Sequence, residues 1–215
     1  MSDGADRDVP VEFPVTGDSL VVRPPGHGRW AFDVLPVDPD SGAVATGGWW
    51  RYLAGRLHAA DVAGWGRQVR SPVNGPVVAS HDGVPDRQRL LPWRDVPAGL
   101  LICPLLRGRD LAAMAGNHVV VGGEGRFAFL AHLQQGSVRV HAGETVHAGQ
   151  VLGLVGSSGN AIGPHLHLQL MAGPDPMAHR PVPFVVRRFQ HRDGNRWDER
   201  TAAPLPAGRA RIRVQ

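Results

Sequence analysis

Two histidines on one face of a short apolar segment are the first sign of chemistry in this sequence. His165 and His167 are separated by one leucine, and polar and apolar residues alternate from there to Met171. Because side chains at i and i+2 of a strand share a face, the two imidazoles and Gln169 point one way and the leucines point to the core. Paired imidazoles of this kind are candidates for metal binding or acid–base catalysis.

A histidine and a carboxylate closer to the N-terminus add the other ligand type that zinc uses. His27 and Asp33 lie at the start of a predicted strand, residues 30–37. Zinc binds imidazole nitrogen and carboxylate oxygen, and its catalytic sites combine three protein ligands with a water. His27, Asp33 and one histidine of the 165/167 pair would form such a set.

Other familiar catalytic patterns are missing from the sequence. It has no His-Glu-X-X-His, which excludes a helix-borne zinc site of that kind. It has no Gly-X-Ser-X-Gly nucleophile turn. The glycine-rich stretch 153–159 lacks the Lys-Ser/Thr of a phosphate-binding loop. A zinc hydrolase therefore remains the best interpretation of these patterns.

The composition is basic, with 23 arginines and no lysine, a net charge of +4 and a pI of about 10.7. Such a chain can attract polyanions, including an anionic cell wall, but arginine codon preference explains the bias equally well, and we expect no nucleic-acid partner. A single cysteine excludes an intrachain disulfide. No apolar run is long enough for a membrane span. No signal peptide is visible, which as written predicts a cytoplasmic protein.

Abundant glycine and proline predict many turns and short strands. We expect a mainly β fold of short strands with at most short helices, one at 111–115 and one within 38–66. The predicted organisation is a flexible lead-in over 1–10, a β domain over 11–191 that includes long, less regular segments at about 38–70 and 82–116, and a polar, Arg-rich, loosely packed tail over 192–215. The expected strands are 19–23, 30–37, 77–80, 118–121, 126–133, 137–140, 150–155 and 165–171.

Several short motifs in fixed order resemble those of the lysostaphin-type (β-lytic, LytM-like) zinc metallopeptidases. They are His27…Asp33, the run 116–121 (GNHVVV), Ala131-His132-Leu133, the run 146–153 (VHAGQVLG) and Gly163-Pro164-His165-Leu166-His167. The resemblance is close over 116–171 and looser over 21–80. It implies an antiparallel β core of the duplicated-hybrid-motif kind with a narrow groove, and the hydrolysis of peptide bonds in peptidoglycan.

By position, the resemblance assigns one Zn²⁺ per chain to His27, Asp33 and His167, and it makes His132 and His165 the catalytic histidines. Three departures stand out. The segments 38–70 and 82–116 look like long inserted loops relative to small members of the family. Five residues separate His27 from Asp33 where three are commonest, and Leu130 stands where the family often has tyrosine. A rival group, His81 with Asp82 and Asp86, follows the strand at 77–80, whereas the family's ligands precede theirs.

Alternatives from other classes remain. One alternative is a non-catalytic protein that keeps the zinc site and binds or regulates a partner through the groove. The missing signal peptide favours this alternative, because a cytoplasmic protein does not meet the mature cell wall. Export by another route would bring the protein to a wall substrate. The swinging-arm carriers that 138–155 resembles need an acceptor lysine, which this chain lacks. A histidine phosphocarrier would not need His27 or Asp33. Asn117 either supports the site or caps a turn, and Trp49, Trp50 and Trp65 either pack inside the insertion or line the cleft. The oligomeric state cannot be predicted.

Overall fold

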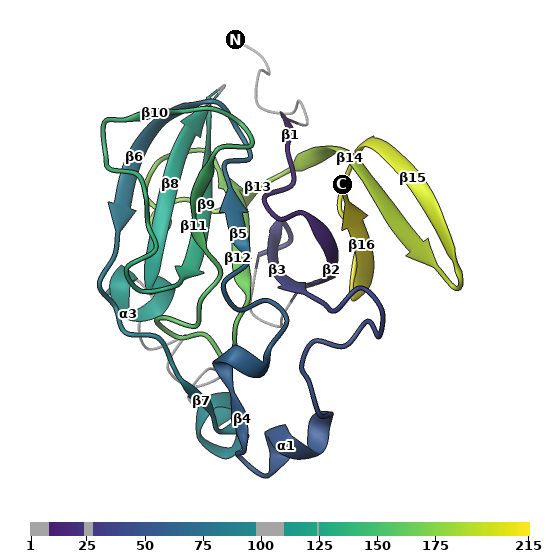
Figure 1. Ribbon diagram of the computed structural model, residues 1–215. Helices are drawn as coiled ribbons and strands as arrows, with labels where there is room; N and C mark the ends of the chain where they lie inside the picture. Colours follow the sequence, from purple (N-terminus) through teal and green to yellow (C-terminus); the bar gives the residue numbers. More distant parts are fainter. Residues whose placement is uncertain (1–8, 24–27, 98–109, 124) are drawn as a thin grey trace.

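A computed structural model describes residues 9–23, 28–97, 110–123 and 125–215, without the side chain of Trp49. Its main feature is one twelve-stranded sheet in which β1 pairs with β14 in parallel and all other pairs are antiparallel (Figure 1). The order is β1-β14-β16-β2-β3-β12-β9-β8-β6-β10, with β13 beside β12 and β15 beside β14. The expected mainly β, antiparallel class is confirmed.

The bounds of the elements show how short most of them are. The strands of the main sheet are β1 (Val9–Val11), β2 (Gly17–Val22), β3 (Ala31–Pro36), β6 (Gly75–His81), β8 (Asn117–Gly123), β9 (Arg126–Leu133), β10 (Thr145–Val146), β12 (Leu166–Met171), β13 (Pro181–Val182), β14 (Phe184–Asp193), β15 (Arg196–Ala203) and β16 (Ala210–Val214). Two small sheets pair β5 (Gln68–Arg70) with β11 (Val151–Leu154) and β4 (Leu57–His58) with β7 (Arg89–Leu90). The helices are α1 (Trp49–Leu53), the 3-10 turn η1 (Ala59–Asp61), α3 (Leu111–Ala115) and a further short helix at 92–97.

Alternation of polar and apolar residues along β12 separates a core face from the face that carries His167 and Gln169. Leu166, Leu168 and Leu170 of β12 are fully buried in the main core, together with valines of β8 and with residues of β5 and β11. The intervening His167 and Gln169 point to the opposite face, as the alternation predicts. The buried apolar side chains fix the register, because a slip of one residue would exchange the two faces.

Helix α3, which is part of the second insertion, folds back onto the face of the sheet that carries His167 and Gln169. Helix α3 matches its predicted bounds, and Asp110 caps it by accepting a hydrogen bond from the backbone of Ala113. Leu111 and Ala115 pack against Phe129 and neighbouring side chains of β8, β9 and β12. The helix therefore covers part of the sheet beside the predicted site.

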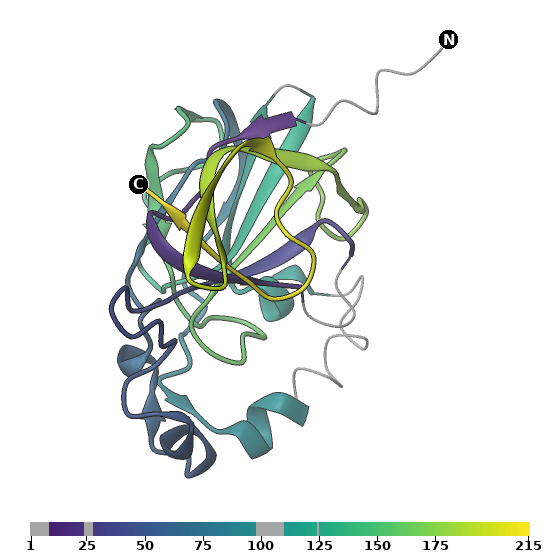
Figure 2. The same ribbon diagram turned by 90° about the vertical axis from the view of Figure 1, so that its right-hand side faces the viewer.

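The two insertions also meet each other, in a small lobe that we call the insert lobe, residues 44–63 and 87–97. Leu57 and Val62 of the first insertion share a separate core with Leu90 of the second, and β4 pairs with β7. The lobe lies at the lower end of the molecule in Figures 1 and 2. The helix expected within 38–66 is limited to α1, because Gly55 has a left-handed φ of 62° and the chain then enters β4.

Two other expectations differ from the structure. Residues 137–140 do not form a strand, although the N–H of Arg139 donates to the carbonyl of Leu152 on β11. The segment 192–215, for which we expect loose packing, provides β15 and β16, and β16 is inserted between β2 and β14. The arginine-rich sequence did not predict these strands, because a strand with one face exposed to solvent needs few apolar residues.

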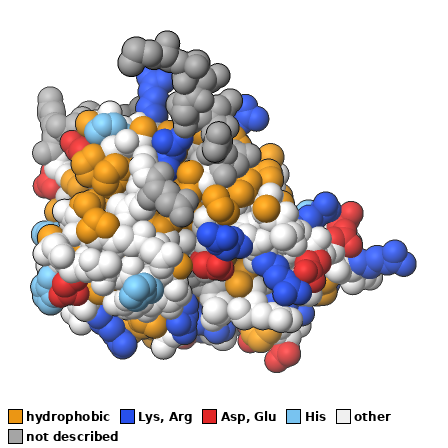
Figure 3. All heavy atoms as spheres, turned by 90° about the horizontal axis from the view of Figure 1, so that it is seen from above, with side chains coloured by type: hydrophobic (Ala, Val, Ile, Leu, Met, Phe, Trp, Pro, Cys, Tyr) orange, Lys and Arg blue, Asp and Glu red, His pale blue; other side chains and the backbone are white. Residues whose placement is uncertain are grey.

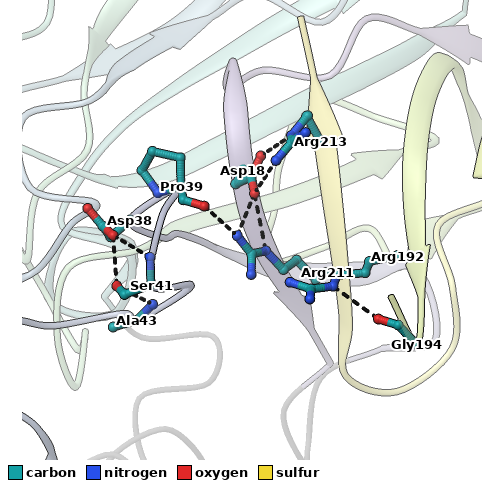
Figure 4. A network of polar contacts seen from close by, with 9 residues as sticks. All are labelled: Asp18, Asp38, Pro39, Ser41, Ala43, Arg192, Gly194, Arg211 and Arg213. Atoms are coloured by element: carbon teal, nitrogen blue, oxygen red, sulfur yellow. Dashed lines mark hydrogen bonds and ion pairs between the residues drawn. The ribbon is translucent and has the colours of Figure 1, made fainter. Parts of the chain in front are cut away.

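The strand β16 is held by a carboxylate that lies far away in the sequence. Asp18 of β2, 5% exposed, accepts hydrogen bonds from Arg211 and Arg213 of β16, with an Arg211 Nη2–Oδ2 distance of 2.6 Å (Figure 4). The guanidinium of Arg213 also lies 4.2 Å from the ring centroid of Trp197 on β15. One buried carboxylate thus joins the last strand to the second.

On the neighbouring strands β14 and β15, positively and negatively charged side chains are mixed. Arg188 of β14 pairs with Glu199 of β15, and Arg200 pairs with Asp198 along β15. Figure 3 shows blue and red side chains mixed on the side where this hairpin projects. The basic composition therefore does not produce a face of one sign here. Within the described ranges, no helix is long and apolar enough to cross a membrane.

We predict that Asp18→Asn lowers the free energy of unfolding at pH 7 by about 1–3 kcal/mol, because it removes charged hydrogen bonds from a buried position. Burial raises the pKa of Asp18, but the hydrogen bonds and charges of Arg213 and Arg211 outweigh it, so the net pKa is lowered. This contribution is present above the unfolded-state pKa of about 3.9 and is lost as the pH falls through the folded-state value. Urea unfolding between pH 7 and 2 measures it.

The matched control is Asp198→Asn, which removes an exposed ion pair whose atoms are 3.9 Å apart, and which should change stability by less than about 0.5 kcal/mol. Equal effects of the two substitutions at pH 7, or the same acid dependence in Asp18→Asn and the wild type, would contradict this role of Asp18.

Candidate active site

The candidate site starts from the pairing of β3 with β12. Asp33 stands directly opposite His167 in this antiparallel register, and directly opposed residues point to the same face. The Oδ1 atom of Asp33 lies 3.1 Å from Nδ1 of His167, and both residues are buried, 8% and 7% exposed. The other ring nitrogen of His167, Nε2, lies 3.1 Å from Oε1 of Gln169.

His165 lies one step before β12 and approaches the same carboxylate. Its Nε2 is 3.4 Å from Oδ2 of Asp33, and its Nδ1 is 2.8 Å from the carbonyl oxygen of Gly163. The carbonyl accepts a hydrogen bond from Nδ1–H, which turns Nε2 towards the site. The pair that the sequence placed on one face therefore converges on Asp33.

His132 reaches this cluster through a β-bulge. The register between β8 and β9 shifts so that Asn117 faces Leu133 while His118 faces Ala131, which leaves His132 as the extra residue. Its φ is 65°, an unusual value for a residue that is not glycine. Bulges re-aim side chains and are frequent beside active sites. The His132 ring centroid lies 4.7 Å from that of His165.

The loop 156–160 holds this bulge in place through hydrogen bonds. The carbonyl of Ser158 lies 3.0 Å from Nδ1 of His132 and accepts its N–H. The Ser158 hydroxyl donates to the carbonyl of Leu133 and accepts from the backbone N–H of Asn117. The Asn117 side chain donates to the carbonyls of Val84 and Leu133. Asn117 also accepts a hydrogen bond from the N–H of Val84, so its side chain holds both the bulge and the loop at Val84.

The environment of His132 fixes its charge. Burial lowers its pKa well below 6.5, and the neighbouring His165 and His167 lower it further, while Asp33 and the carbonyl of Ser158 oppose this effect. The ring is consequently neutral near pH 7. Since Nδ1 carries the proton that Ser158 accepts, Nε2 carries a lone pair and is able to take up a proton.

The donor atoms of Asp33 and His167 suit a shared cation. If Nε2 of His167 donates to Gln169, then Nδ1 presents a lone pair to a carboxylate oxygen 3.1 Å away. Two facing acceptors need a proton or a metal ion between them. Donors of one tetrahedral zinc, with bonds of about 2.0–2.1 Å, lie about 3.3 Å apart, so the spacing fits two ligands of one ion.

The third predicted ligand, His27, lies outside the described residues. Within the part of the chain that the structure describes, no three His, Cys, Asp or Glu side chains form a complete metal-binding group. Of the predicted set, only Asp33 and His167 fall in that part. The structure brings together Asp33, His132, His165 and His167, and does not test His27.

The rival group takes up other roles. Asp86 accepts hydrogen bonds from the backbone of Ser157 and Gln135, and Asp82 accepts from Gly136. His81 stacks on His118, with ring centroids 5.6 Å apart. The two carboxylates therefore hold loops next to the site and are not gathered around a ligand.

Two functional residues were not singled out by the sequence. Gln169 shares the face of the two histidines, so strand alternation was a sufficient signal for it. Ser158 had no such signal, since its contacts to Asn117 and His132 connect residues 41 and 26 positions apart. A loop residue of this kind is recognised only once the fold is known.

Part of the chain matches a known protein family. Residues 106–179 match the model of peptidase family M23. Similar solved structures include a putative M23 peptidase from Pseudomonas aeruginosa (20% identity, 76% of this chain and 49% of that chain covered, TM-score 0.42) and the catalytic domain of the prophage-encoded M23 protein EnpA from Enterococcus faecalis (18%, 83% and 92%, 0.41). A third is the catalytic domain of the antimicrobial peptidase lysostaphin from Staphylococcus simulans (14%, 80% and 88%, 0.40).

The chain spans about half the length of the Pseudomonas aeruginosa protein. A search of curated proteins gives no match. The matched segment contains His132, His165 and His167, three of the four described residues of the cluster. The resemblance to the lysostaphin-type peptidases is thereby confirmed over residues 106–179, the segment that matches the model of peptidase family M23.

Proposed function

We propose that the protein is a zinc-dependent endopeptidase that cleaves peptide bonds of peptidoglycan. The observation that carries the proposal is the convergence of His132, His165 and His167 on Asp33 within a chain that matches a peptidase family. The cluster combines metal-type donors with a neutral imidazole, which is the combination that metal-assisted hydrolysis needs. A wall substrate implies that the protein acts outside the cytoplasm.

The proposed ligands are His27, Asp33 and His167. When bound, zinc polarises the scissile carbonyl and lowers the pKa of a coordinated water from ~15.7 towards ~7. Gln169 holds His167 so that Nδ1 faces Asp33. If Nδ1 of His167 carried the proton instead, an N–H group without a free lone pair would face Asp33.

The two other histidines divide the proton chemistry. Nε2 of His132 accepts the proton of the attacking water, because this ring is neutral and its Nδ1 proton is held by Ser158. As the ring becomes charged, Asp33 stabilises it. His165, whose Nδ1–H donates to the carbonyl of Gly163, presents Nε2 to the reacting centre close to Asp33; with both ring nitrogens protonated, Nε2–H would donate a hydrogen bond to the developing oxyanion.

We predict about one zinc per chain in the wild type and almost none in His167→Ala, since this variant loses one of three ligands. Elemental analysis after gel filtration measures it. His81→Ala is the matched control, because His81 is an exposed histidine that stacks on His118 away from Asp33. Equal zinc in wild type and His167→Ala would refute the ligand assignment.

We predict that His132→Ala keeps its zinc but loses about 10²–10⁴-fold in kcat, because it removes a positioned proton acceptor. Hydrolysis of purified peptidoglycan, followed by the release of new amino groups, measures the loss. If His132→Ala also lost its zinc, His132 would be a ligand. If the zinc-loaded wild type did not hydrolyse peptidoglycan, a non-catalytic, groove-binding role would take the place of the proposal.

We predict that Gln169→Leu weakens zinc binding by roughly 10–100-fold, the usual cost of removing the partner of a metal-bound histidine. Gln169→Glu keeps an acceptor for Nε2–H and should bind zinc about as well as the wild type. Competition with a chromophoric chelator gives both affinities without an activity assay. An unchanged affinity in Gln169→Leu would show that Gln169 does not orient His167.

A further inference from the structure

The insert lobe carries an unusual concentration of exposed apolar side chains. Of the six large hydrophobic residues that the described chain exposes, four lie in this lobe and only Val78 and Ile162 lie elsewhere. The four are Trp50 (67% exposed), Leu53 (48%), Trp93 (60%) and Val96 (36%). Scattered apolar residues on a surface need no explanation, but a cluster that includes two tryptophans indicates a binding surface.

The four side chains form two matching pairs. Trp50 and Leu53 are three residues apart on α1, and Trp93 and Val96 are three residues apart on the helix at 92–97. Residues at i and i+3 lie on one side of a helix. The helices adjoin, because a β-carbon at Gly55, just after α1, would collide with the indole of Trp93. We call these four residues the tryptophan platform.

The platform is firmly attached to the candidate site by two routes. Asp95, fully buried on the Trp93 helix, is bound by Arg87, which also donates to the carbonyl of Gly159 in the loop that holds His132. By the second route, Leu90 packs against Gly163, whose carbonyl orients His165. The loops that orient His132 and His165 therefore contact the lobe that carries the platform, through side chains other than the tryptophans.

We propose that the tryptophan platform binds the glycan strand of the peptidoglycan whose peptide enters the site. Indole faces stack on the C–H faces of sugar rings, so two exposed indoles on separate short helices suit a chain of such rings. The inference rests on the proposed function for the identity of the polymer.

The charge of the lobe agrees with this occupant. Five arginines and two aspartates give the lobe a positive balance: Arg51, Arg56, Arg87, Arg89, Arg94, Asp61 and Asp95. The aspartates are paired with Arg51, Arg87 and Arg94, whereas Arg56 and Arg89 are exposed. Wall peptides carry free carboxylates beside the glycan, which exposed arginines complement.

The test compares Trp50→Ala/Trp93→Ala with the wild type in sedimentation with insoluble, purified peptidoglycan in the presence of a chelator, so that binding is measured without hydrolysis. We expect the dissociation constant of the double variant to rise roughly 30-fold or more, as for tryptophans at binding hot spots. Val78→Ala, which removes another exposed apolar side chain from β6, outside the lobe, is the control and should bind like the wild type. Equal binding of all three proteins overturns the proposal.

Two further measurements separate this inference from its alternatives and from the proposed function. If the platform binds glycan, wild-type tryptophan fluorescence changes on titration with β-1,4-linked N-acetylglucosamine oligosaccharides, but not with anionic phospholipid vesicles; a response to vesicles alone would assign the platform to a lipid surface and overturn the proposal. Hydrolysis of short soluble wall peptides should be unchanged in the double variant. A wild type that binds peptidoglycan through the tryptophans without hydrolysing it would refute the peptidase and leave this inference intact.

Discussion

The candidate site depends on the register between β3 and β12, which sets Asp33 opposite His167. Each strand keeps that register because its alternate side chains are buried: Phe32 and Val34 on β3, and the leucines on β12, contact the same core. Shifting either strand by one residue would bury the carboxylate or the imidazole among these side chains. The packing that stabilises the sheet is therefore also what brings the metal-type donors to within 3.1 Å of each other.

A second layer of polar contacts determines how the histidines are oriented. His132, His165 and His167 each have one ring nitrogen beside a protein oxygen, from Ser158, Gly163 and Gln169 respectively. Such contacts select a tautomer as well as an angle. The strain at His132, with φ at 65°, persists because Ser158 and Asn117 hold both sides of the bulge. The reactive geometry is thus maintained by neighbours that take no part in the proposed chemistry.

The sequence predicts much of this arrangement because its signals are local. Alternation along β12 gave the faces of His165, His167 and Gln169, and apolar content gave the core strands and α3. Three features lay beyond such signals. The bulge at His132 depends on pairing with Asn117, the lock at Ser158 depends on a loop, and the strand β16 depends on Asp18, which is 193 residues from Arg211. Contacts between distant residues are properties of the folded chain and leave no periodicity.

The insertion of β16 between β2 and β14 has a consequence for the order in which the sheet can form. Strand β2 lies directly beside β3, which carries Asp33, yet its other neighbour is a segment about 190 residues later in the chain. While the protein is being synthesised, β2 can pair with β3 long before β16 exists, and one row of its backbone N–H and C=O groups is then open to other chains. Until β16 pairs with β2, the free edge of β2 can therefore pair with other chains and promote aggregation. Proteolytic loss of β16 would expose the same edge in the folded protein.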